Sequence, residues 1–158
     1  MWDLITIQMS DDFGKLTIFD LYNNCQNSNT IDTLGEYLVS QLQVSHPSCP
    51  DYSIWCGNFN WYHRMWDKEQ NHHLFTTGVL EDSGKLLTLV VDSNMVMVLP
   101  KDIPTLESMS TKNWTRPDNT FCSSNLEEKI VYCTTNPRLQ GPSTDHVPIL
   151  MAVEFPVM

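Results

Sequence analysis

Two β-rich runs at the start of the chain constrain its fold more than any other feature. They cover residues 4–9 and 15–22 and are separated by the short polar segment SDDFG. This pattern predicts a β-hairpin. The second run is apolar on both faces, with Ile18 on one and Phe19 on the other. We therefore expect this strand to be covered on both sides, within a mixed sheet rather than a doubly wound parallel one.

Helix and strand patterns interleave along the rest of the chain. Ile31, Leu34 and Leu38 recur at helical spacing and predict an amphipathic helix over residues 29–44. The pairs Leu86/Leu87 and Val90/Val91 predict a second helix over residues 84–93. Short apolar runs predict further strands at residues 52–56, 95–100, 119–124, 129–135 and 147–155. These elements predict an α+β fold.

Size and charge limit the possible functions. A chain of 158 residues is long enough for one domain with its own core. The formal net charge of −10, with only nine Lys and Arg residues, works against unaided binding to a phosphate backbone. The charge therefore disfavours a nuclease function. It does not exclude one, because metal ions at a site could screen the charge.

The five cysteines are widely spaced, and no pair has the spacing of zinc ligands. They are expected to be reduced thiols in a nuclear or cytoplasmic protein that is not secreted. No apolar run has the length of a membrane span, and the first residues do not resemble a signal peptide.

Polar clusters follow several of the predicted strands, where loops that carry functional groups tend to gather. Taken singly, each cluster is explained by turn formation or helix capping, because Asn, Asp and Ser favour these positions. The clusters are residues 22–24, Asn58 with Asn60, residues 116–119 and residues 143–146.

The order of these clusters resembles the endonuclease/exonuclease/phosphatase superfamily, and most closely its retroelement-type, abasic-endonuclease-like domains. The resemblance covers nearly the whole chain. It rests on the segments LTIFDLYNNCQNSNTIDTL, CGNFNWYHRMWD, NHHLF, LPKDIPTLESMSTKNWTRPDNTFCS and STDHVPI.

The resemblance implies roles for three residues at the first two clusters. Tyr22 is similar to a tyrosine that contacts the scissile phosphate. The segment GNFN, residues 57–60, is similar to the family's G-D-F-N, whose aspartate deprotonates or orients the attacking water. Asn58 stands at the position of that aspartate, and Asn60 at that of an asparagine that holds the phosphate and the water.

Four further residues receive roles from the same resemblance. Thr105 is similar to a residue that lines the DNA-facing loop. Asp118 corresponds to an aspartate that pairs with the terminal histidine, here His146, which hydrogen-bonds the phosphate. Asp145 corresponds to the aspartate on the metal side. The resemblance thus implies Mg²⁺ or Mn²⁺ as cofactor and DNA as partner, with Asp145 as a partial ligand set.

Two departures from the family pattern affect the expected activity. Asn58 is an amide, which cannot accept a proton from water, and loss of a positioned base costs about a hundred- to ten-thousand-fold in rate. The family also has an earlier half that supplies an asparagine and the glutamate that is its principal metal ligand. No residue before Tyr22 replaces them.

We therefore expect residues 1–158 to form a single partial domain, the C-terminal half of a four-layer sandwich of two mixed sheets flanked by helices. The expected function is that of a degenerate or truncated phosphodiesterase relative with little or no activity alone. Two alternatives stay open: an active Mg²⁺-dependent endonuclease or phosphatase when the other half is supplied, or a noncatalytic interaction module. Self-association through the uncovered sheet is also expected.

Aromatic residues follow the GNFN segment. Trp61, Tyr62 and Trp66 could stack on nucleic-acid bases, but packing of the loop is the favoured interpretation.

Overall fold

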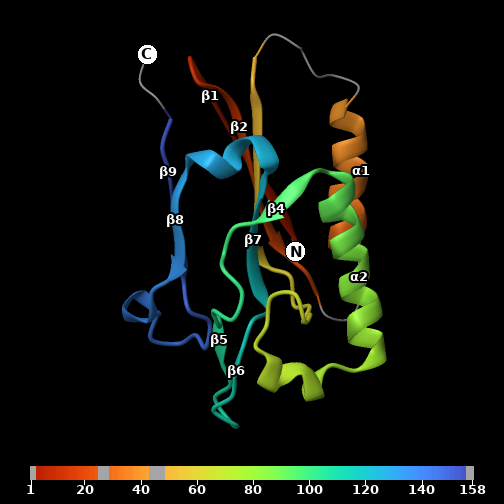
Figure 1. Cartoon of the computed structure of the whole chain (residues 1–158), viewed down its shortest axis with the longest axis vertical. Helices are drawn as coiled ribbons and strands as arrows, with labels where there is room; N and C mark the ends of the chain where they lie inside the picture. Colours follow the sequence, from red (N-terminus) through yellow and green to blue (C-terminus); the bar gives the residue numbers. More distant parts are fainter. Residues whose placement is uncertain (1–2, 25–28, 43–48, 156–158) are drawn as a thin grey trace.

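The computed structural model describes residues 3–24, 29–42 and 49–155. Its central element is a five-stranded sheet with the order β1-β2-β3-β7-β4 (Figure 1). Neighbouring strands pair antiparallel except β2 and β3, which are parallel. The predicted hairpin and the predicted mixed sheet are therefore confirmed. The strands are β1 (Leu4–Asp11), β2 (Gly14–Tyr22), β3 (Asp51–Asn58), β4 (Met95–Met97) and β7 (Asp118–Ser123).

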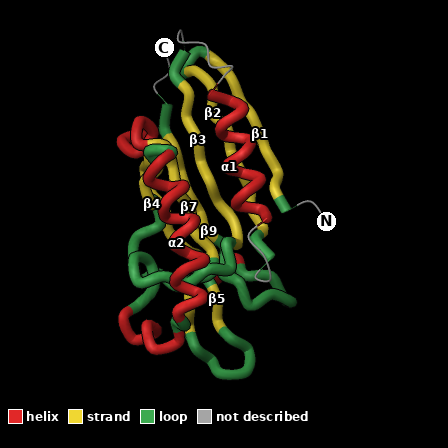
Figure 2. The backbone as a smooth tube through the Cα atoms, turned by 90° about the vertical axis from the view of Figure 1, so that its right-hand side faces the viewer, coloured by secondary structure: helices red, strands yellow, loops and turns green. Residues whose placement is uncertain are grey.

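Two helices, α1 (Asn29–Leu42) and α2 (Thr77–Asp92), cover one face of this sheet (Figures 1 and 2). The core between them contains Phe19, Trp55 and Phe121 from three strands. The second helix begins well before the expected start at residue 84. Thr76 explains this, because its hydroxyl accepts the Val79 N–H at 3.3 Å and caps the helix.

On the opposite face lie β8 (Ile130–Thr135) and β9 (Ile149–Val153), which pair antiparallel as a two-stranded sheet (Figure 1). Met151 and Val153 of β9 pack against a second apolar cluster that includes Leu16 and Ile54 of the central sheet. The described part of the chain thus forms a five-stranded sheet with helices on one face and a two-stranded sheet on the other, which confirms the predicted α+β fold class.

Two predicted strands are shorter in the structure, and each of the two predicted ranges contains a proline outside the observed strand. The strand expected over residues 147–155 begins after Pro148, and the Val147 N–H binds the carbonyl of Thr105 at 2.7 Å instead. The strand expected over residues 95–100 ends at Met97. The carbonyls of Leu99 and Pro100 accept hydrogen bonds from Arg116 instead of from a neighbouring strand.

Several short elements were not predicted. A small hairpin joins β5 (Leu106–Glu107) to β6 (Trp114–Thr115), and three 3₁₀ helices connect the larger elements: η1 (Glu69–Leu74), η2 (Ser124–Lys129) and η3 (Pro137–Leu139). In the described part of the chain, no helix is long and apolar enough to span a membrane.

Candidate functional site

Three of the predicted site residues form one row across the end of the central sheet. The strand register pairs Tyr22 with Asn58, and Asn58 with Asp118. Residues directly opposite each other on neighbouring strands project to the same face. The sheet therefore brings together side chains that lie far apart in the sequence.

Asp118 forms an ion pair with His146. The Asp118 carboxylate oxygens lie 2.8 and 3.1 Å from His146 Nδ1. The hydrogen bond to Asp118 raises the pKa of His146 above its usual value, an effect that partial burial opposes and that the charges of Asp118 and Asp145 reinforce. A protonated His146 directs its second nitrogen away from Asp118, where it can donate to an anion.

Thr105 holds both members of this pair in place. Its hydroxyl accepts the backbone N–H of Asp118 at 3.2 Å, and its carbonyl accepts the N–H of Val147. Leu106, the next residue, forms a β-bridge with His146. Thr105 is fully buried, and these hydrogen bonds hold it beside Asp118 and Val147. Its expected place in a DNA-facing loop stays a prediction.

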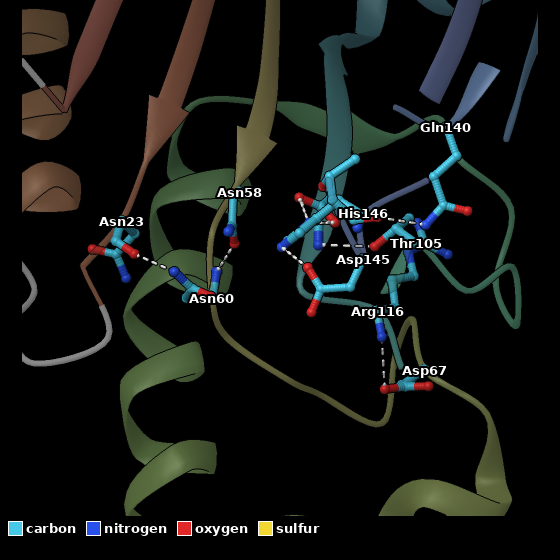
Figure 3. A network of polar contacts seen from close by, with 11 residues as sticks. Asn23, Asn58, Asn60, Asp67, Thr105, Arg116, Gln140, Asp145 and His146 are labelled. Atoms are coloured by element: carbon cyan, nitrogen blue, oxygen red, sulfur yellow. Dashed lines mark hydrogen bonds and ion pairs between the residues drawn. The ribbon is translucent and has the colours of Figure 1, made fainter. Parts of the chain in front are cut away.

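An amide network occupies the end of β3 (Figure 3). Asn58 Oδ1 accepts the backbone N–H of Asn60 at 2.9 Å, and Asn60 Nδ2 donates to the carbonyl of Asn23 at 2.7 Å. The Asn23 side chain is completely buried and donates to the carbonyl of Phe59. Both predicted asparagines, Asn58 and Asn60, therefore also shape the turn that carries them.

The backbone of this turn depends on residue type. Gly57 has φ 124°, and a Cβ at that position would lie 2.2 Å from the carbonyl oxygen of Leu21. Asn60 has φ 54°, in the left-handed region that asparagine tolerates better than most residues. The sequence GNFN is thus suited to a sharp turn at the end of a strand, independently of any chemistry.

The side chains near Asp145 form only a partial ligand set for a Mg²⁺ ion. Asp145 Oδ1 lies 3.9 Å from His146 Nε2, and both oxygens of Asp118 are within hydrogen-bond distance of Nδ1. Asn58 Oδ1 already accepts a backbone N–H. Among the described residues there is no group of three or more His, Cys, Asp or Glu side chains that could hold a metal. Mg²⁺ takes an octahedral set of oxygen ligands, several of which are usually waters, so Asp145 would supply one protein ligand of a partial set.

A buried arginine beneath the site was not identified from the sequence as a structural element. The Arg116 guanidinium donates to the carbonyls of Trp66, Leu99 and Pro100 and to Asn119 Oδ1. Its backbone N–H donates to the buried carboxylate of Asp67 at 3.3 Å (Figure 3). Burial lowers the pKa of Arg116 to about 10, which still leaves it charged at neutral pH. This network fixes the segment that leads into Asp118.

A cavity of about 630 Å³ opens beside the Asp118–His146 pair. Its wall continues along the sheet face through Asp20 and Cys56 to Ile18 and Met151. Burial, and then the nearby charge of Asp20, raises the pKa of Cys56 to about 11. Its thiol is therefore protonated at neutral pH and unsuited to act as a nucleophile.

The aromatic residues after the GNFN segment are mostly part of the core. Trp61 and Trp66 are 4% and 1% exposed. This confirms packing rather than base stacking as their arrangement. Tyr62 is partly buried, and its ring stacks on Phe75 at a centroid distance of 6.1 Å.

Comparisons with known proteins were made by sequence and by structure. No family model and no curated protein matches the sequence. Solved structures do match over almost the whole chain. The endonuclease domain of TRAS1, a telomere-specific non-LTR retrotransposon, has a TM-score of 0.73 at 15% identity, and the match covers 97% of this chain and 64% of that one.

Two further solved structures share the same architecture. The AP endonuclease LMAP from Leishmania major has a TM-score of 0.74 at 17% identity, with 98% of this chain and 55% of that one covered. The 3'-5' exonuclease NExo from Neisseria meningitidis has a TM-score of 0.62 at 14% identity, with 95% and 65% covered. The chain thus spans about half to two-thirds of the length of these structures.

These matches agree with the sequence resemblance, and they show the fold alone, because the identities are low. The five-stranded mixed sheet and the helices of this chain match the fold of the solved structures. The chain has the fold of the endonuclease/exonuclease/phosphatase-type proteins.

Proposed function

We propose that this chain is a degenerate phosphodiesterase-type domain that does not cleave phosphodiesters on its own. Two observations support the proposal: the chain has a nuclease-type fold, and its site contains only some of the groups that the family resemblance implies. The Asp118–His146 pair is present, with 2.8 Å between Asp118 Oδ2 and His146 Nδ1. At position 58 an amide stands where the resemblance implies a carboxylate base, and the described residues include no group of three or more His, Cys, Asp or Glu side chains that could hold a metal.

The position of Asn58 carries this proposal. Asn58 is the cross-strand neighbour of both Tyr22 and Asp118, so it occupies the centre of the row of site residues. A carboxylate there could accept a proton from water, whereas an amide cannot. Its oxygen also accepts the backbone N–H of Asn60, which gives Asn58 a structural role in the turn.

DNA is the partner that the fold suggests, since the similar structures include an AP endonuclease and a retrotransposon endonuclease domain. The site offers a cationic donor in His146, whose pKa is raised by the hydrogen bond to Asp118. The net charge of −10 opposes binding to a polyanion, because long-range repulsion is not offset by clustered Lys and Arg. We therefore expect DNA binding to be weak, with only a shallow dependence on salt, because few Lys or Arg contacts would release counterions.

A plasmid-nicking assay tests the proposal. Supercoiled plasmid, with and without abasic sites, is incubated with the purified chain in Mg²⁺ or Mn²⁺. We expect no conversion to nicked circles above that of a His146→Ala variant prepared in parallel. Metal-dependent nicking by the wild-type chain that His146→Ala abolishes would contradict the proposal.

A second candidate function is an active endonuclease or phosphatase whose missing ligands come from another polypeptide segment. The intact Asp118–His146 geometry favours this alternative, since a site under no constraint would have no reason to keep it. Fusing the metal-binding half of an active relative ahead of Met1 tests it. We expect the fusion to be nearly silent and to gain about a hundredfold with Asn58→Asp, the usual effect of a positioned base.

Equal activity of the two fusions would mean that residue 58 is not the base position. The alignment of GNFN with the family loop would then be wrong. Full activity of the unmodified fusion would favour the second candidate over the degenerate domain.

A further inference from the structure

A second cavity, of about 360 Å³, opens beside the candidate site. We name it the Trp114 pocket. Its lining residues are Lys68, Pro104, Trp114, Thr135, Pro137 and Val147. Val147 also lines the larger cavity beside Asp118 and His146, so the two cavities adjoin at this residue. The volume of the Trp114 pocket is within the usual range for small-molecule sites.

Hydrogen bonds between distant segments hold the walls of the Trp114 pocket in place. The Trp114 carbonyl accepts a hydrogen bond from Asn71 Nδ2 at 2.8 Å. The Val147 N–H donates to the carbonyl of Thr105 at 2.7 Å. Two of the lining residues are prolines, whose rings fix the backbone φ angle. A pocket with walls held in this way loses little conformational entropy when it binds a ligand.

The Trp114 pocket has a positive charge, in contrast to the protein as a whole. Lys68 is the only charged residue among its described lining residues, and the Lys68 ammonium forms no ion pair within the described part of the chain. The neighbouring Asp67 is buried, and its carboxylate accepts hydrogen bonds from within the protein. Three other cavities also have a lining lysine, but carboxylates line each of them as well. The Trp114 pocket is therefore suited to an anion.

The same pocket offers an aromatic surface. Trp114 is partly buried, and its ring stacks on no other aromatic ring among the described residues. Trp61 and Trp66, in contrast, lie in the core. An available indole ring stacks on nucleic-acid bases of any sequence, because every base has a π-face. A lysine ammonium binds phosphate as a point charge. Together, the two groups match a ligand that joins an aromatic ring to a phosphate.

We propose that the Trp114 pocket binds a single nucleotide, with the base against Trp114 and the phosphate at Lys68. The choice of a nucleotide among aromatic anions rests on the proposed function, because it takes the ligand class from the nuclease-type fold. A free mononucleotide and one nucleotide of a DNA strand offer this same chemistry. In a strand, the neighbouring nucleotide would lie toward the adjoining cavity beside the Asp118–His146 pair.

Titration of the whole, isotope-labelled chain tests this inference. Thymidine 5′-monophosphate, thymidine, inorganic phosphate and a thymidine hexanucleotide are added separately, and NMR follows the indole N–H signal of Trp114. The monophosphate should shift this signal saturably, with a roughly millimolar dissociation constant. Thymidine and inorganic phosphate should each bind at least about threefold more weakly. Tighter binding of the hexanucleotide than of the monophosphate would identify a strand as the source of the nucleotide, and weaker binding a free mononucleotide.

Variants separate the two parts of the ligand. Lys68→Gln should weaken binding of the monophosphate about two- to fivefold and make it equal to that of thymidine, as expected for loss of a partly exposed ion pair. Lys101→Gln is the matched control, since it makes the same change at an exposed lysine outside the pocket.

The aromatic contact is tested in the same way. Trp114→Ala should weaken binding of the monophosphate about fivefold or more, and Trp114→Phe should restore most of the affinity. Binding to these two variants is followed through the backbone amide signal of Lys68. Thermal melting by circular dichroism shows whether each variant is folded, and the Lys68→Gln result stands without them.

Several results would overturn the inference. One is the absence of a saturable shift with the monophosphate. Another is an equal effect of Lys68→Gln and Lys101→Gln on its binding. Loss of binding on His146→Gln, with no effect of Lys68→Gln, would place the ligand at the Asp118–His146 pair instead. Plasmid nicking by the chain would contradict the proposed function and leave these binding results unaffected, so the two failures are distinguishable.

Discussion

The two faces of the central sheet differ in how completely they are covered. On the helix face, Phe19, Trp55 and Phe121 are at most 2% exposed beneath α1 and α2. On the other face, β8 and β9 leave a cavity of about 630 Å³ and the exposed isoleucines of β1. All of the candidate chemistry lies at one end of this second, less complete face.

The helix face contributes mainly to stability, whereas the opposite face carries the candidate functional site. Burial of large apolar side chains on the helix face supplies most of the hydrophobic stabilisation, because this term scales with the apolar area removed from water. The other face contributes less packing and keeps space for a ligand. Substitutions on the two faces should therefore have different consequences for stability.

Phe19→Ala should lower the free energy of unfolding by about 3–5 kcal/mol, the usual cost of removing a buried aromatic ring. Ile7→Ala, on the same hairpin but half exposed, should change it by no more than about 0.5 kcal/mol. Urea denaturation followed by circular dichroism measures both. Similar losses for the two variants would show that the cavity face is as tightly packed as the helix face.

Arg116→Lys tests the buried network beneath the site. Lysine keeps the charge but cannot reproduce the planar set of donors that serves three carbonyls and Asn119. The expected loss is about 1–3 kcal/mol, the cost of leaving buried acceptors without partners. Lys101→Arg, on an exposed residue, is the control in the same denaturation experiment. An unchanged midpoint for Arg116→Lys would mean that this network is not a source of stability.

Asn58→Asp places a carboxylate directly across from Asp118. Like charges on opposed strand positions should destabilise the fold by about 0.2–1 kcal/mol. In the isolated chain this change should not produce nicking, because the metal ligand set is still incomplete. A gain of metal-dependent nicking by this single substitution would show that residue 58 alone limits activity.

The smallest effect concerns pH. The folded pKa of His146 is raised, so its stabilising contribution is complete below the ordinary value near 6.5 and is lost as pH rises through the folded value. Relative to His146→Gln, the wild-type chain should be more stable near about pH 6, by less than about 1 kcal/mol, and should lose this advantage as the pH rises above the folded pKa of His146. An advantage that grows with pH would contradict the ion pair with Asp118.

Sequence patterns predicted much of the sheet and the order of the site residues. The hairpin was visible because residues 4–9 and 15–22 have strong strand patterns with a short polar turn between them. Tyr22 and Asn58 each end a strand, and Asp118 begins one. Because these three strands are neighbours in the sheet, the residues form a row. Local patterns of this kind survive in the fold because they agree with the tertiary packing.

Features that depend on distant pairings could not be predicted. The burial of Thr105 results from its contacts with Asp118 and Val147, which no local pattern encodes. The same holds for Arg116, whose acceptors Leu99 and Trp66 come from other parts of the chain. A charged residue in a polar loop is predicted to be exposed when its hydrogen-bond partners are not known.

The pairing of β3 with β7 has a consequence for how the chain folds. In the sequence, α2 and β4 intervene between these neighbours, so their contact closes a long loop, whereas β1 and β2 meet through a tight turn. Loop closure delays distant pairings relative to local ones. During synthesis from the N-terminus, one edge of β3 therefore stays unpaired until β7 has emerged. The Asp118–His146 pair forms later still, because His146 follows β8, and the β8–β9 pairing must wait for residues that follow His146.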